Sequence, residues 1–134
     1  MNVTEIIQHG QENKLKKEVY DVPYLEVGEF VAQGDINLIR IPDLPQGVYL
    51  DKNPQKQLVE GNSKGARHCL NSLDKVKIYH LDNPNPLQIC IIEFLSGETI
   101  LTHPEHKHLR FTQPCFVLVT HQRSYADDLK AIAD

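Results

Sequence analysis

The chain contains no tryptophan, a single methionine and only three cysteines, which are Cys69, Cys90 and Cys115. Their number is odd and no Cys-x-x-Cys pair occurs, so the sequence indicates neither a disulfide framework nor a structural zinc knuckle. Cys90 and Cys115 stand in apolar runs, and we expect both to be buried small hydrophobes. Cys69 follows His68, but neighbours in a strand point to opposite faces, so the two side chains are not expected to bind one ion together.

The chain also lacks long apolar runs and a basic face. No run approaches the ~20 apolar residues of a membrane span. Residues 1–5 show neither a basic n-region nor an apolar h-region, so we expect no secretory signal and take the cytoplasm as the compartment. The net charge is −4 with neutral histidines, and the basic residues are dispersed. Nucleic-acid binding through phosphate neutralisation is therefore not expected.

Several catalytic motifs are missing as well. There is no Gly-x-Ser-x-Gly elbow, and the loop over residues 61–65 does not complete a phosphate-binding Gly-x4-Gly-Lys-Ser/Thr pattern. Pro104 excludes a helical His-Glu-x-x-His zinc site. The interval from Gly97 to His103 fits a cupin motif, but Glu105 stands where the second cupin histidine belongs, so the match is incomplete.

The sequence consists mainly of short segments with strand-forming residues, separated by turns that contain Gly and Pro. A chain of 134 residues forms one domain with a sizeable core. We predict a mainly β single domain, a sandwich or a distorted small barrel with short terminal helices. Residues 88–95 are apolar on both faces and predict a central strand, and Ser96-Gly97 predicts a hairpin to residues 98–102. The predicted strands cover residues 35–41, 48–50, 57–60, 75–80, 88–95, 98–102, 109–111 and 115–121.

The N-terminal quarter has a different pattern. The apolar positions from Val3 to about Lys17 predict an imperfect helix, and residues 19–31 are typical of a loop or an edge strand. We therefore divide the chain into residues 1–32, an N-terminal helix and extended lead, and residues 33–134, the β domain. A short helix is predicted from Tyr125 to Ala133.

The segment His103-Pro104-Glu105-His106-Lys107-His108 carries the chemistry that stands out most. Imidazole and carboxylate groups bind divalent metals, and imidazole also titrates near neutral pH. A metal site needs about three protein ligands within ~2.0–2.2 Å of the ion, so this segment requires a remote partner. His68 and His121 are the candidates for that partner.

Three interpretations of these histidines stay open. They are solvated or structural residues, or a metal-free acid–base or pH-sensing group, or a site in which His68, His103 and His106 bind a divalent metal. In the metal hypothesis Glu105 is a fourth ligand or a general base acting on bound water. That hypothesis requires the imidazoles to lie within about 4 Å of one another.

Four motifs in fixed order resemble those of a group of small uncharacterised bacterial and phage-associated proteins. The group has a Gly-Asp opening strand, a Gly-His-x-His turn, a His-x-Glu-His segment and a terminal Gln-Arg-x-Tyr. The resemblance covers roughly residues 33–134 and carries no assigned activity; Ala66 stands where the group has the first turn histidine. The corresponding residues here are Gly34-Asp35, Gly65-Ala66-Arg67-His68, His103-Pro104-Glu105-His106 and Gln122-Arg123-Ser124-Tyr125.

No complete catalytic constellation is visible in the sequence. We therefore expect a small cytoplasmic binding or accessory module without enzymatic activity, which binds a protein partner or associates with itself through a sheet edge. The alternative is a β protein whose histidine and glutamate residues bind a divalent metal for hydrolytic or oxidative chemistry.

Overall fold

The computed structural model describes residues 19–59 and 68–122. All the regular structure in these two ranges is β, in ten strands. The helices expected over residues 3–17 and 125–133 lie outside the described residues. Among those that are described, no helix has the length and apolar character needed to cross a bilayer.

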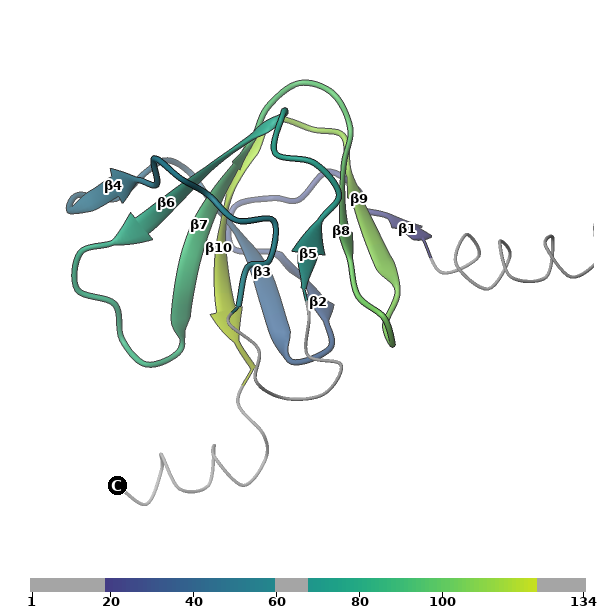
Figure 1. Cartoon of the computed structure of the whole chain (residues 1–134), viewed down its shortest axis with the longest axis horizontal. Coiled ribbons are helices and arrows are strands. Elements are labelled where there is room, and N and C mark those ends of the chain that lie inside the picture. Colours follow the sequence, from purple (N-terminus) through teal and green to yellow (C-terminus); the bar gives the residue numbers. More distant parts are fainter. Residues whose placement is uncertain (1–18, 60–67, 123–134) are drawn as a thin grey trace, which may run out of the picture.

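The strands form two sheets that pack as a sandwich (Figure 1). The smaller sheet has the order β1 (Val19–Asp21), β9 (His108–Phe111), β8 (Thr99–Thr102) and β5 (Cys69–Leu70). The larger sheet has the order β2 (Phe30–Gln33), β3 (Ile36–Ile41), β10 (Cys115–His121), β7 (Gln88–Phe94), β6 (Val76–Leu81) and β4 (Val48–Leu50). The predicted sandwich is confirmed, and the described strands do not close into a barrel.

The core lies between the two sheets because apolar residues alternate along their strands. Phe94 on β7 and Phe111 on β9 stack across this core with ring centroids 4.2 Å apart. The central position predicted for residues 88–95 is confirmed, since β7 lies between β10 and β6. Cys90 is buried, whereas Cys69 and Cys115 are half-buried, and all three are free thiols.

The hairpin predicted at Ser96-Gly97 is wrong. β7 belongs to the six-stranded sheet, whereas β8 pairs with β9 and β5 in the other one. Gly97 has a φ of +122°, and this backbone conformation turns the chain from one sheet to the other. Gly and Ser mark a turn in the sequence, but they do not show which strand the next segment joins.

Part of the extended lead lies inside the β domain. β1 pairs in parallel with β9, and β2 pairs antiparallel with β3. Both are edge strands, so a boundary after residue 32 does not separate the lead from the sheets. Of the strand predicted over residues 57–60, the described residues 57–59 form one bridge, between Gln57 and Cys69, and the β5 strand was not predicted.

Candidate functional site

His68, which immediately precedes β5, is the centre of a buried polar cluster. Its Nδ1 lies 2.8 Å from Gln33 Oε1, and its Nε2 lies 2.7 Å from Asp35 Oδ1. Gln33 is the last residue of β2, and Asp35 precedes β3. The tight β2–β3 turn therefore holds both nitrogens of one imidazole.

Gly34 shapes this turn. Its φ is +56°, whereas Asp35 has a negative φ, the combination typical of a type II′ two-residue hairpin with glycine first. A Cβ atom on Gly34 would lie 2.7 Å from Cδ2 of His106. Glycine is therefore favoured at this position for two reasons: it adopts the positive φ easily, and it leaves room for the His106 ring.

The amide of Gln33 fixes the tautomer of His68. Gln33 Nε2 donates to the carbonyl oxygens of Leu101 and Lys107, at 2.9 and 2.8 Å, so its Oε1 must be the atom that faces His68. His68 Nδ1 therefore carries a proton and donates it to Gln33. The contact of Nε2 with the Asp35 carboxylate needs a second proton, because both of those atoms are otherwise acceptors.

Burial and charge act against each other in this pair. Burial lowers the pKa of His68 below its ordinary value of 6.5, and Asp35 only partly offsets this effect. Burial raises the pKa of Asp35, but the hydrogen bond and charge of His68 outweigh it and leave that pKa below 3.8. The Asp35 side chain is 62% exposed, so the pair joins a buried base to a solvated acid.

Three imidazole rings form a row at this end of the sandwich. The ring centroids of His68 and His103 lie 4.6 Å apart, as do those of His103 and His106. The backbone N–H of Glu105 donates to His103 Nδ1 at 3.0 Å, so the neutral His103 ring carries its proton on Nε2. Burial is the main cause that lowers the pKa of His103, and the neighbouring histidines add to it.

Three of the six ring nitrogens in this row have hydrogen-bond partners within the protein. Both nitrogens of His68 and the Nδ1 of His103 have protein partners, which leaves too few free nitrogens for a three-ligand site. Over residues 19–59 and 68–122, no set of three His, Cys, Asp or Glu side chains is arranged to hold a metal ion. The predicted residues His68, His103 and His106 are adjacent, but their geometry gives the metal hypothesis no support.

The other predicted residues are peripheral to this cluster. Glu105 contributes its backbone N–H to His103 and is exposed to solvent. His108 is the first residue of β9, opposite Val19. His121, at the end of β10, pairs with Ile36 and adds a charge interaction with Asp35.

The described parts of the four sequence motifs meet in space. Gln122 donates its backbone N–H to the Asp35 carbonyl at 2.7 Å, beside the turn that holds His68. Sequence reasoning missed Gln33 as a site residue, and it recorded Asp35 only as part of the Gly-Asp motif. The signal for both was the glycine between them, since a turn residue with positive φ brings its two neighbours to one point.

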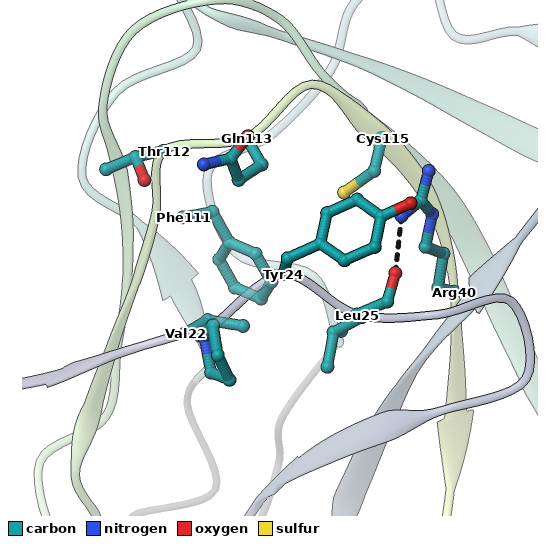
Figure 2. A pocket seen from close by; sticks show the side chains of 9 residues that line it. Val22, Tyr24, Leu25, Arg40, Phe111, Thr112, Gln113 and Cys115 are labelled. Atoms are coloured by element: carbon teal, nitrogen blue, oxygen red, sulfur yellow. Dashed lines mark hydrogen bonds between the residues drawn. The ribbon is translucent and has the colours of Figure 1, made fainter.

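A small hollow near the other end of the sandwich is packed shut (Figure 2). Arg40 Nη1 donates to the Leu25 carbonyl, and its guanidinium carbon lies 4.6 Å from the centre of the Tyr24 ring. The enclosed volume is about 10 Å³, which is about the size of one water. This hollow is therefore too small for a ligand larger than a water molecule.

The outward face of the six-stranded sheet, here called the outer face, carries a row of large apolar and aromatic side chains. Leu38, Val119 and Cys90, which precede or follow members of this row in their strands, belong to the core. Because successive side chains in a strand point to opposite faces, the row lies on the side away from the core. Paired residues continue the row across every strand of this sheet. From edge to edge they are Phe30, Ile39, Leu118, Ile91, Tyr79 and Leu50.

One connection crosses this face. β3 and β4 are separated by three strands, so residues 42–47, here called the crossover, must span four strand spacings, roughly 19 Å. Leu44 of the crossover and Ile91 of the outer face line a common groove. Ile91 is 0% exposed although it does not belong to the main core. Part of the apolar row is thus covered by the chain itself.

The groove between the crossover and the sheet remains open. Its volume is about 380 Å³, and a second hollow of about 350 Å³ shares Ile41 and Pro42 with it. Both volumes reach the lower end of the range for ligand sites, roughly 300–1,000 Å³. The groove is lined by Ile41, Pro42, Asp43, Leu44, Pro45, Leu81, Gln88, Ile91 and Leu118.

These features define a two-sheet β sandwich. At one end, His68 is hydrogen-bonded to Asp35 and Gln33, and the apolar outer face contains a groove. The chain belongs to the family described as a domain of unknown function, DUF8820, which matches residues 32–121. No curated protein and no solved structure matches the chain. The family segment begins in β2 and ends with β10, so it contains Gln33, Asp35, His68 and the whole groove.

Proposed function

We propose that this protein is a non-enzymatic binding module that binds a protein partner through the outer face of its six-stranded sheet. The observation that carries the proposal is the unbroken apolar and aromatic row from Phe30 to Leu50. An antiparallel sheet with one solvated face normally alternates apolar and polar residues. A row of this kind marks a binding surface, since large apolar patches on a single chain are rare.

The crossover does not account for the whole row. Phe30 and Leu50, at the two ends, remain 58% and 47% exposed. Both lie on short edge strands, β2 and β4. A partner that covers them would also reach the groove, which lies between them across the sheet.

The histidine cluster supports a binding module over an enzyme. General acid–base catalysis needs a nitrogen that reaches the substrate. Both nitrogens of His68 are held by Gln33 and Asp35, and His103 is buried with its Nδ1 hydrogen-bonded, so His106 is the one exposed ring of the three. The cluster fastens the β2–β3 turn to β5 and to the segment before β9, so its role in the proposal is to stabilise the sandwich.

The proposal keeps the cytoplasm as the compartment. Cys69, Cys90 and Cys115 are free thiols, as is usual where thiols stay reduced. Fractionation of cells that express the untagged chain tests this part separately.

Charge placed on the outer face tests the function. Phe30→Glu and Leu50→Glu each put a carboxylate at one end of the row, and Tyr20→Glu makes the same change on β1 of the other sheet, where Tyr20 is 43% exposed. Proteins retained by each variant are identified by quantitative mass spectrometry. Each candidate is then purified and titrated against the four chains, and self-association is measured by sedimentation.

We expect one partner, or a second copy, to bind the wild type and Tyr20→Glu alike. Both outer-face variants should bind at least about tenfold more weakly, the effect expected for a charge buried in an apolar contact. Equal binding by all four chains, or selective loss in Tyr20→Glu, would contradict the proposal. Circular dichroism and the unfolding midpoint of each variant separate loss of binding from loss of folding.

A further inference from the structure

The groove combines an apolar lining with one charged side chain. Asp43 supplies the only charge among the described residues that line it, and Gln88 the only neutral polar side chain. Gln88 Oε1 already accepts from the backbone N–H of Asn85. The Asp43 carboxylate is exposed and accepts from the Leu44 N–H with Oδ1, so its second oxygen remains available to a ligand.

A second acidic residue follows the groove lining in the sequence. Asp82 follows the lining residue Leu81, and its backbone N–H donates to the carbonyl of Gly47 at the end of the crossover. On the outer face, Lys77 lies opposite Glu93 in the β6–β7 register. The charge at the groove is therefore negative, and it favours a cationic ligand.

The crossover gives the groove a stiff rim. Pro42 and Pro45 both line it, and proline fixes φ near −65°, so this stretch loses little conformational entropy when a ligand binds. The groove is thus preformed rather than closed by a mobile loop.

The crossover argues against a second copy of the chain as the occupant. Residues 42–47 run over the outer face and break the flat surface that sheet-on-sheet packing needs, whereas a short peptide fits beside them.

We infer that the groove binds a short peptide segment in which large apolar side chains are followed by lysine or arginine. The apolar side chains contact Leu44 and Leu118, above the buried Ile91, and the cation pairs with the Asp43 carboxylate. The inference rests on the proposed function, because it names the class of partner for the same surface.

Two synthetic peptides test it. Both contain the sequence Phe-Leu-Leu between blocked ends, followed in one by two lysines and in the other by two glutamates. Each is titrated into the ¹⁵N-labelled full chain at low and high salt, and the amide shifts are mapped. The variants are Asp43→Asn, which keeps the acceptor for Leu44 N–H, and Asp74→Asn, which removes the same charge at an exposed position before β6.

We expect the lysine peptide to shift the amides of Leu44, Ile91 and Leu118. Its affinity should fall about fivefold in Asp43→Asn and at high salt, as for one partly screened ion pair, and remain unchanged in Asp74→Asn. Equal binding of the glutamate peptide would overturn the inference and leave the outer face as a binding surface. Shifts confined to other regions, or no binding at millimolar peptide, would also overturn it. In that case the glutamate variants at Phe30 and Leu50 still decide the proposed function.

Discussion

Gln33 requires a proton on Nδ1 of His68. Its amide donates to two carbonyl groups, from Leu101 and Lys107, and this leaves Oε1 to accept from His68 Nδ1 at 2.8 Å. One buried side chain thus connects β2, the residue before β5, the end of β8 and the segment before β9.

Removing the Gln33 amide should destabilise the protein strongly. Gln33→Leu retains much of the volume but leaves two carbonyls and the His68 N–H without partners, and each buried unsatisfied group costs ~1–3 kcal/mol. We expect a loss of at least ~3 kcal/mol in the free energy of unfolding, measured by urea denaturation. The control Gln113→Leu changes an exposed glutamine and should stay within ~0.5 kcal/mol. Similar losses in the two variants would argue against the connecting role of Gln33.

A side chain at Gly34 should be costly for two separable reasons. Gly34→Ala forces a positive φ on alanine, worth ~1–2 kcal/mol, and its Cβ meets the His106 ring at 2.7 Å. Gly28 also has a positive φ, but nothing lies within 4 Å of its Cβ position, so Gly28→Ala isolates the backbone cost. We expect Gly34→Ala to lose more stability than Gly28→Ala. The difference should shrink when His106 is also changed to Ala, and its persistence there would disprove the ring contact.

Stability should fall as the pH drops below about 6.5, the ordinary pKa of histidine. Because burial lowers the pKa of His103 in the folded state, the unfolded chain binds more protons below that pH. The free energy of unfolding should decrease by up to ~1.4 kcal/mol per pH unit for this group. The lowered pKa of Asp35 contributes only at more acidic pH, below 3.8.

His103→Asn tests the assignment of this pH dependence. Asparagine retains an acceptor for the Glu105 N–H in the manner of an Asx turn but does not titrate. We expect a shallower slope between pH 7 and 5 in denaturation profiles. The difference should persist at about 0.5 M salt, since salt screens charge pairs but leaves desolvation unchanged. An unchanged slope would show that His103 does not cause the pH dependence.

The sequence predicted the strands better than the contacts between them. The alternation and β-branched content of residues 88–95 and 115–121 are local signals, and both segments form long strands of the larger sheet. The destination of the chain after Gly97 depends on which sheet has space for the next strand, and no local pattern encodes that. The histidines showed a similar limit. Only the metal hypothesis required them to be adjacent, and the engagement of the His68 nitrogens depends on Gln33, 35 residues away.

The exposed apolar row was also beyond the sequence analysis. Ile39, Leu118 and Ile91 each look like core residues, because an apolar side chain in a strand is normally counted toward the core. Their position on the outer face follows only from the register of β3, β10 and β7. The crossover that covers Ile91 follows from the strand order, which again depends on long-range pairing.

The engaged histidine nitrogens lead to a prediction about zinc. To bind a metal together with His103 and His106, His68 would have to give up its hydrogen bond to Gln33 or to Asp35, and His103 can offer only Nε2. We expect untagged protein to contain far less than one metal ion per chain by elemental analysis. Added zinc should leave the unfolding temperature within ~1 °C, because only binding to the folded state raises it. The double variant His103→Ala, His106→Ala should show the same metal content. Near-stoichiometric metal that disappears in the double variant would instead restore the metal hypothesis, and would require the His68 contacts to rearrange when the ion binds.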